Sequence, residues 1–567
     1  MKEKILPFVI CFILTIPLLS QNRDKKLSDL HLPETYVTVT LESQAQIEKL
    51  GKTFSIDKVF YHAENSNFTV QIWLNQNQYL RFDSLDIPYS TIENEANKSA
   101  LSMATSVVEM QSWNHYPTYS TYLAMMDRFQ SRYPQLCRID TILSNTPGGH
   151  KILAAHISNH PELEENKPAF FYSSSIHGDE VSGYMLMLRL IDYLLSNYEK
   201  DSSIQNLVNN IKIWICPLEN PDGTYRVSNN LIGPSPISTR GNANGMDLNR
   251  SYPPIGYLRH PLEPEIEAMI HFVESHYFVM SANFHGGSEV YNYPFDLWKA
   301  THKAHADDGW FEMIGRKYAD SCHFYADNNY FTEMNNGVTQ GAAWYTVEGS
   351  RQDYMNFYQH CREATIELSL NKIPDSTVLS QLWRYNKASL LHYMEECLEG
   401  FRGTITDSIT GEPVKAFVSV KQHDCNNSEV FSTPSVGNYH RPIRAGNYTV
   451  YFYAKNYLPK TYEITVSDDN VVILDVELVR GTLPINKKIK IDIFPNPTRN
   501  KINIVIPEWE NQNIVATLWD INGKLLKNET IKSETTLLDL SYYATGIYII
   551  NFITKEGFTS SHTIIKE

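Results

Sequence analysis

Cysteine, positive charge and long apolar runs are all scarce in this sequence, and each shortage excludes a class of protein. Only 7 of the 567 residues are cysteine, and no two form a C-x-x-C pair. A disulfide framework and a thiolate metal site are therefore not expected, although the sequence does not exclude one or two isolated disulfide bridges. Lys and Arg number 49 against 64 Asp and Glu, and the net charge of −15 argues against nucleic-acid or anionic-membrane partners. After Leu19 no apolar run is long enough to span a bilayer.

The composition that remains is that of folded, soluble material, with 42% hydrophobic and 12% aromatic residues. A chain of this length is expected to form roughly three or four domains. Residues 1–20 combine a short charged start with an apolar stretch from Ile5 to Leu19, and polar residues follow. This pattern predicts a secretory signal peptide and hence an exported mature protein without a transmembrane segment.

Residue patterning divides the rest of the chain into four parts. Residues 26–110 predict a small α+β unit and a linker; a propeptide-like role in folding or inhibition and an inert accessory role fit equally well. Residues 111–398 alternate apolar strands with helices, which predicts an α/β domain of ordinary enzyme size. Residues 399–480 and 487–567 consist of short strands separated by turn residues, which predicts two β-sandwiches.

The first candidate for chemistry lies in the α/β part, where His177 and Glu180 directly follow the apolar run 169–172. This spacing is a weak signal alone, because a helix start with a capping acid gives the same pattern. A second apolar run ends in His285, followed by two glycines. Two imidazoles and one carboxylate are a ligand set for catalytic Zn²⁺, which leaves a fourth position for water.

Other polar residues of this part have the chemistry that such a metal needs. Glu367 interrupts an apolar strand, where a carboxylate is costly without a partner or a task, and would serve as the general base. Arg240 would stabilise an oxyanion. Asn249 and Arg250 would hold a terminal carboxylate, the arginine through its bidentate fork. Asp247 is placed to orient the first histidine of the metal set.

These motifs, in this order, resemble the zinc carboxypeptidase family across the whole central domain. The matching pieces are His177-x-x-Glu180, Asn220-Pro221-Asp222-Gly223, Arg240, Asp247-Leu248-Asn249-Arg250, His285 and Ile366-Glu367-Leu368. The resemblance implies an α/β fold with a mixed central sheet flanked by helices, one Zn²⁺, and hydrolysis of the C-terminal peptide bond. It also places the substrate-capping tyrosine at Tyr345.

Residues 283–296 look like the regulatory branch of that family, which includes carboxypeptidases N, E and D. In that branch the positions of Asp296 and Gln352 line the pocket for the last side chain, and a buried carboxylate there favours C-terminal Arg or Lys. Where the branch usually has Gly-Gly-Met-Gln-Asp, this chain has Arg351 in place of the methionine. An inward Arg351 would pair with Asp296 and shift the preference to neutral or acidic ends; we expect it to point to solvent.

The two C-terminal parts also resemble known domains. Residues 403–408 and 445–450 resemble the transthyretin-like domain that follows these enzymes. Residues 494–497 and 545–548 resemble the sorting domain of type IX secretion, an address for passage across the outer membrane; a sandwich that binds carbohydrate or a surface partner is the alternative. The resemblance implies the outer-membrane secretion machinery as a partner and a secreted or cell-surface location.

The sequence thus predicts an exported zinc metallocarboxypeptidase that acts on peptide or protein C-termini and prefers Arg or Lys. A peptidase of the same fold that acts on cell-wall peptides is one alternative. A non-catalytic peptide-binding module is another, and the presence of all three metal ligands together with Glu367 argues against it.

Overall fold

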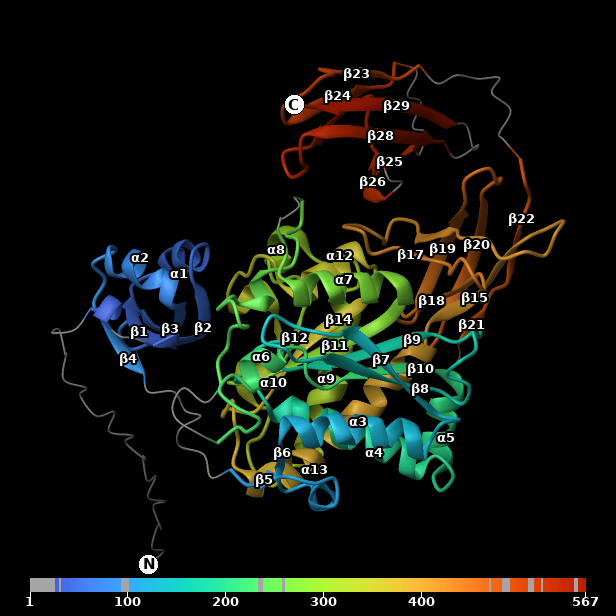
Figure 1. The fold of residues 1–567 in the computed structure, drawn as a ribbon. Helices are drawn as coiled ribbons and strands as arrows, with labels where there is room; N and C mark the ends of the chain where they lie inside the picture. The colour runs from blue at the N-terminus through green and yellow to red at the C-terminus, as the bar shows by residue number, and fades with distance from the viewer. Residues whose placement is uncertain are drawn as a thin grey trace, which may run out of the picture.

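The computed structural model describes residues 26–29, 32–92, 101–232, 238–256, 261–468, 471–481, 490–507, 514–521, 524–554 and 559–567. The expected signal peptide, residues 1–20, lies outside these ranges. Figure 1 shows a large α/β body with a small N-terminal unit on one side and β-rich units on the other. Among the described helices, none has the length and apolar character that a membrane crossing requires.

The N-terminal unit is a four-stranded antiparallel sheet of order β2-β3-β1-β4, with two short helices. Its elements are β1 (Glu34–Leu41), α1 (Gln44–Gly51), β2 (Ser55–His62), β3 (Asn67–Asn75), α2 (Tyr79–Asp83) and β4 (Tyr89–Ile92). Alternate residues of the sheet, such as Val37, Val39, Val70 and Ile72, form its core. The β2–β3 register shifts between Ile56 and Lys58, so the residue between them is a bulge.

The central body is built on an eight-stranded mixed sheet of order β13-β12-β14-β11-β9-β10-β8-β7. Its strands are β7 (Cys137–Leu143), β8 (Ile152–Ile157), β9 (Ala169–Ser174), β10 (Lys212–Cys216), β11 (Phe278–His285), β12 (Glu289–Tyr293), β13 (Val338–Gln340) and β14 (Arg362–Leu368). The inner strands β8 and β9 are buried over their whole length because helices cover both faces of the sheet. The predicted α/β class with a mixed central sheet is confirmed.

Helices lie on both faces of this sheet (Figure 1). The described helices and helical turns of the body are α3 (Tyr119–Arg132), α4 (Ser182–Asn197), α5 (Ser202–Asn210), α6 (Pro221–Thr224), α7 (Pro264–His276), α8 (Ala300–Lys303), α9 (Asp308–Tyr325), α10 (Glu333–Gly337), α11 (Gly341–Trp344), α12 (Arg351–Tyr358) and α13 (Leu379–Glu395). One core joins the sheet to α3, α4, α9 and α13, and a second joins it to α7 and α12. A short parallel pair, β5 (Met103–Ala104) and β6 (Tyr116–Pro117), precedes α3.

The parallel strands β9, β11 and β14 set the position of the functional residues. His177 and Glu180 occupy the loop between β9 and α4, and His285 is the last residue of β11. His285 and Glu367 are register partners on β11 and β14. Because carboxyl ends of parallel strands meet at one edge of a sheet, these four side chains gather there.

Two β units follow the body, each with its own core. The first contains β15 (Phe401–Asp407), β16 (Phe417–Val420), β17 (Val430–Phe431), β18 (Asn438–Arg441), β19 (Gly446–Tyr453), β20 (Lys460–Val466), β21 (Val472–Ile473) and β22 (Val476–Leu478). The second contains β23 (Asp492–Phe494), β24 (Lys501–Val505), β25 (Ile514–Asp520), β26 (Leu525–Ile531), β27 (Thr535–Asp539), β28 (Gly546–Ile553) and β29 (Thr559–Lys566). Within the described residues all 6 cysteines are unpaired.

Candidate active site

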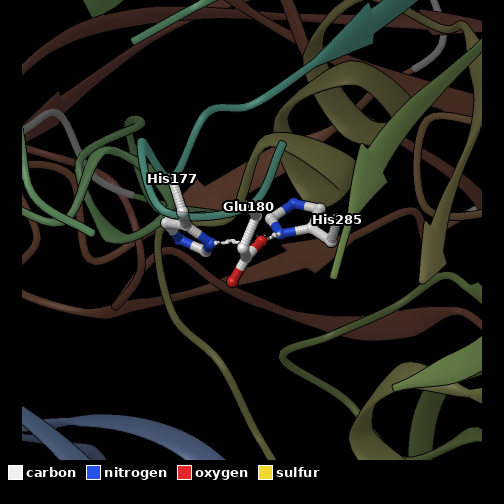
Figure 2. A group of neighbouring side chains, drawn as sticks. All are labelled: His177, Glu180 and His285. Carbon is white, nitrogen blue, oxygen red and sulfur yellow. Dashed lines mark hydrogen bonds and ion pairs between the residues drawn. The ribbon is translucent and has the colours of Figure 1, made fainter. Parts of the chain in front are cut away.

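His177, Glu180 and His285 form a compact group of potential metal ligands (Figure 2). Glu180 Oε2 lies 3.0 Å from His177 Nδ1 and 2.8 Å from His285 Nδ1, and the two nitrogens are 3.1 Å apart. All three residues are buried. Burial lowers the pKa of His285 to about 4, which keeps its ring neutral and its lone pair free for a metal. Two imidazoles and one carboxylate whose ligand atoms converge within 4.8 Å fit a zinc ion.

The loop that carries the first two ligands is closed by its own hydrogen bonds. Ser175 adopts a left-handed conformation with φ 58, and its Oγ donates to the carbonyl oxygen of Glu180 over 2.6 Å. Outside the loop, His177 Nε2 lies 3.1 Å from Asp247 Oδ1. This contact leaves Nδ1 as the ring atom that faces the other ligands.

Arg240 connects the metal ligands to this supporting carboxylate. Its Nε donates to Asp247 Oδ2 over 3.0 Å, and one terminal nitrogen lies 3.3 Å from Glu180 Oε1. The guanidinium is buried. A buried cation in this position is placed to stabilise negative charge that develops beside the ligand group.

Glu367 projects from β14 into the cavity that the three ligands line. In the described part of the chain nothing donates a hydrogen bond to its Oε2, although the atom is buried. Burial first, and the nearby Glu180 second, raise the pKa of Glu367 well above its ordinary value. A carboxylate with an unpaired oxygen and a high proton affinity is suited to accept and return a proton.

Asn249 and Arg250 line the same cavity, on a short helical turn that spans Leu248–Arg250. Asn249 Oδ1 accepts from the backbone N–H of Arg351 over 2.9 Å, which fixes the orientation of the amide. One terminal nitrogen of Arg250 donates to the Asn249 carbonyl oxygen over 3.0 Å. Tyr345 also lines the cavity and packs against the core of the N-terminal unit.

Of the two proposed specificity residues, Asp296 lines this cavity and Gln352 contacts Asp296. Asp296 Oδ1 accepts from Gln352 Nε2 over 3.0 Å and from Asn292 Nδ2 over 3.3 Å. Gln352 in turn accepts from the backbone N–H of Thr365 over 2.7 Å. A Cβ atom at Gly341 would lie 2.1 Å from Asp296 Oδ1, so this close approach requires glycine.

Asp353, which no sequence motif singled out, holds the backbone at Asp296. Its carboxylate accepts from the N–H groups of Asp296 and Leu297 over 2.7 and 2.9 Å. Ser350 caps α12 and accepts from the Asp353 N–H over 3.3 Å, so its hydroxyl serves the helix start. The Ser-x-x-Asp pattern before α12 was the signal that could have identified this arrangement.

Arg351 corrects a prediction, because it points neither to solvent nor to Asp296. The side chain is 0% exposed and contacts Glu219 and, over 3.2 Å, Glu363. Its guanidinium also lies 4.8 Å from the ring centroid of Phe171. The physical reason is that two buried carboxylates converge on the Arg351 guanidinium and require a cation.

Side chains of the N-terminal unit contact the residues of the active-site region, and no sequence motif indicated these contacts. Asp57 Oδ1 lies 3.0 Å from a terminal nitrogen of Arg240 and 2.6 Å from Lys372 Nζ. Tyr36 donates from its hydroxyl to Asp179 Oδ2 over 2.6 Å. With the unit in place, the cavity has a volume of about 40 Å³. That space holds only a few waters, whereas ligand pockets measure roughly 300–1,000 Å³.

Comparison with known families gives three matches along the chain. Residues 122–389 match the zinc carboxypeptidase family, residues 400–479 the carboxypeptidase regulatory-like domain, and residues 492–567 the secretion system C-terminal sorting domain. The three matches follow one another in the order that the motifs of the sequence indicated.

Curated relatives support the first match. Human carboxypeptidase D is 33% identical over 392 residues, which cover 66% of this chain but only 28% of that protein. Carboxypeptidase SOL1 of Arabidopsis thaliana is 32% identical over 376 residues, 65% of this chain and 73% of that protein. The human carboxypeptidase N catalytic chain is 30% identical over 402 residues, 64% of this chain and 85% of that protein.

A solved structure, carboxypeptidase A from Helicoverpa armigera, matches 64% of this chain and 98% of its own at 16% identity and a TM-score of 0.49. The family match over the body and the identity to the carboxypeptidase N catalytic chain, of which this chain covers 85%, agree with the metal-ligand geometry. The chain belongs to the zinc carboxypeptidase family, whose members are metallocarboxypeptidases.

Proposed function

We propose that this protein is an exported zinc metallocarboxypeptidase that removes the C-terminal residue of peptides or proteins, with a preference for Arg or Lys. One observation carries the proposal. A single cavity is lined by the group of His177, Glu180 and His285, by Glu367 and Arg240, and by Asn249, Arg250 and Asp296. One space is thus faced by the metal ligands, by a general base, by cations that can stabilise developing negative charge and by a carboxylate of the pocket.

Each residue has a role that its position supports. His177, Glu180 and His285 would hold the zinc ion, which when bound acts as a Lewis acid and lowers the pKa of its water. Glu367 would accept a proton and return it to the leaving amine. Arg240 would stabilise the oxyanion of the scissile carbonyl.

Recognition of the substrate end is assigned to the remaining residues. Asn249 and Arg250 would bind the terminal carboxylate, and Tyr345 would cover it. Asp296, held by Gln352, would pair with a cationic side chain at the end of the pocket. Burial raises the pKa of Asp296, so the carboxylate gains most when a guanidinium or ammonium group replaces the lost solvent.

Export and domain roles are part of the same proposal. Residues 1–20 would direct the first membrane passage, and the sorting domain of residues 487–567 would direct type IX passage across the outer membrane to a secreted or cell-surface location. Residues 111–398 would form the catalytic domain and residues 399–480 the transthyretin-like domain. Residues 26–110 would act as a propeptide-like unit, as the contacts of Asp57 in the cavity support.

The proposed function is tested with the purified full chain and blocked peptides that end in Arg, Lys, Phe, Leu or Glu. The Asp57→Asn variant is tested beside it, because Asp57 of the N-terminal unit lines the cavity. We expect release of Arg and Lys, loss of release after chelation, and recovery with added Zn²⁺. Glu367→Gln should abolish release while zinc content stays unchanged. Faster release of Phe or Leu would refute the basic preference, and no release by either form with zinc bound would refute the enzyme assignment.

A further inference from the structure

Lys372 is a buried cation of the active-site region that has no role in the function proposed above. It follows β14 by a few residues and is 8% exposed. Its Nζ lies 3.3 Å from Oε1 of the metal ligand Glu180 and 3.7 Å from Asp179 Oδ2. Its other partners come from the N-terminal unit, where Tyr36 Oη lies 3.0 Å and Asp57 Oδ1 2.6 Å away. A charge this deeply buried requires an anionic or polar partner.

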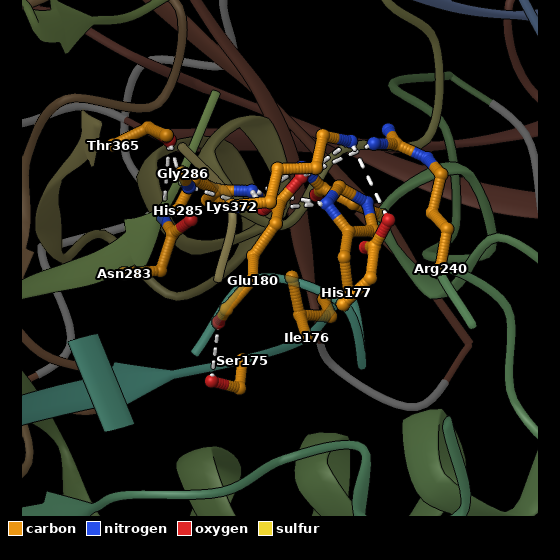
Figure 3. A network of polar contacts seen from close by, with 12 residues as sticks. Ser175, Ile176, His177, Glu180, Arg240, Asn283, His285, Gly286, Thr365 and Lys372 are labelled. Atoms are coloured by element: carbon orange, nitrogen blue, oxygen red, sulfur yellow. Dashed lines mark hydrogen bonds and ion pairs between the residues drawn. The ribbon is translucent and has the colours of Figure 1, made fainter. Parts of the chain in front are cut away.

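Lys372 and Arg240 both contact the same oxygen of Asp57. Asp57 Oδ1 is 2.6 Å from Lys372 Nζ and 3.0 Å from a terminal nitrogen of Arg240. Each of these cations is also 3.3 Å from Glu180 Oε1. Figure 3 shows the two side chains converging on this glutamate. The two cations therefore form a notch for one anionic oxygen, directly beside the metal ligands; we call Arg240 and Lys372 the two-cation notch.

Local backbone structure directs Asp57 into the notch. The register shift between Ile56 and Lys58 makes Asp57 the extra residue of a bulge on β2, and bulges re-aim side chains. On β1, Glu34 accepts from the backbone N–H of Arg240 over 2.9 Å. Asn75 Nδ2, at the end of β3, donates to the Gly245 carbonyl oxygen over 2.8 Å. The unit thus holds its carboxylate in register with the loop that carries the arginine.

We propose that Lys372 is a second oxyanion-binding residue, which with Arg240 holds the scissile carbonyl oxygen as it becomes negative, and that Asp57 occupies this notch in the full chain as an internal competitor. The proposal rests on the proposed carboxypeptidase function. The carboxylate of Asp57 presents an anionic oxygen to the same two donors that an oxyanion would need. Substrate therefore binds productively only after Asp57 leaves the notch.

The proposal predicts the kinetics of four full-length forms. Asp57→Asn removes the anion at nearly constant shape and should raise kcat/KM at least about tenfold, because an amide competes poorly for two cations. Adding Lys372→Met to that variant should lower kcat by roughly 100-fold with KM little changed, the usual result of removing one oxyanion donor. Adding Lys372→Arg instead keeps a cation and should restore most of the rate. Glu64→Gln, an exposed acid of the same unit, is the matched control and should leave the rate unchanged.

Binding of a phosphinic peptide provides a second readout that needs no turnover, because its tetrahedral anion mimics the oxyanion. In titration calorimetry, Asp57→Asn should bind it at least about tenfold more tightly than the parent chain, and Lys372→Met should remove that gain. Zinc content is measured for every form. Equal affinity in the parent and Asp57→Asn would overturn the competitor role of Asp57.

An unchanged kcat and phosphinate affinity in Lys372→Met would overturn the role of Lys372, as would a loss of zinc that accounts for the whole effect. If no form hydrolyses any peptide, the proposed function fails, and the phosphinate affinities still decide whether the two-cation notch binds anions as described.

Discussion

Replacing Arg351 with methionine would leave Glu219 and Glu363 buried without their shared cation. The two carboxylates are 3% and 0% exposed. Breaking a buried ion pair by removing one partner costs about 3–5 kcal/mol, because an uncompensated charge stays behind. In a domain of this size each kcal/mol lowers Tm by roughly 2–4 °C, so a decrease on the order of 10 °C is expected.

The pH dependence of this loss follows from the two carboxyl groups. Burial already raises the pKa of both Glu219 and Glu363 above the ordinary value, and Arg351 opposes that rise. Without the arginine both pKa values rise further, so the folded variant retains protons that the unfolded chain releases. The stability that these two carboxyl groups contribute to the variant is fully present below their pKa in the unfolded chain, about 4.5, and is lost as pH rises through their pKa values in the folded state. The deficit of Arg351→Met should be larger at pH 8 than at pH 5.

The measurement is thermal unfolding of the full chain, followed by tryptophan fluorescence at both pH values. Arg138→Met is the matched control, because Arg138 is half exposed and pairs with Asp140 at the surface over 2.9 Å. Such a pair contributes about 0–1 kcal/mol. A Tm within about 2 °C of the parent for Arg351→Met would refute the structural role. A changed preference for the last residue at unchanged Tm would instead place this arginine in the pocket.

Three further changes test other parts of the structure. Asp296→Asn should lower kcat/KM roughly 100-fold for peptides ending in Arg or Lys, since a buried charge pair is worth about 2–5 kcal/mol. For peptides ending in Leu, kcat/KM should change only a few-fold. Equal losses for both kinds of peptide would contradict the pocket assignment. Asp307→Asn removes the carboxylate that the buried Arg362 and Arg441 share and should cost about 3 kcal/mol. Proteolysis of residues 401–478 no faster than in the parent would contradict this. Burial first, and the charge of Asp179 second, raise the pKa of Glu34 to about 7. Docking of the N-terminal unit should therefore be strongest below about pH 4.5 and weaken as pH rises through about 7. Hydrogen exchange of β1 should be faster at pH 8 than at pH 6, and Glu34→Gln should remove this difference.

Much of the site could be predicted because its signals are local. His177, Glu180 and His285 directly follow apolar runs, and the resulting sheet brings strand ends together at one edge. Burial of Glu367 in an apolar strand was equally visible in the sequence. These features depend on short patterns and on a fold class that the alternation of strands and helices indicates.

The contacts that the sequence could not predict depend on distant residues. Arg351 meets Glu219 across 132 positions, and Asp57 meets Arg240 across 183 positions. No local pattern marks Glu219 and Glu363 as neighbours of Arg351. The prediction that Arg351 points to solvent was therefore wrong. A bulge that aims one aspartate into another unit likewise follows from strand pairing and not from hydrophobic alternation.

The central claim is that this site recognises a free C-terminus and cuts one bond from it. The most direct test incubates the zinc-loaded chain and its Asp57→Asn variant with one peptide ending in Lys, as the free acid and as the C-terminal amide, and follows both by mass spectrometry. We expect the acid to lose its terminal lysine alone and the amide to stay intact, because the proposed role of Asn249 and Arg250 is to bind a terminal carboxylate. Internal cleavage, or equal loss from the amide, would contradict the account.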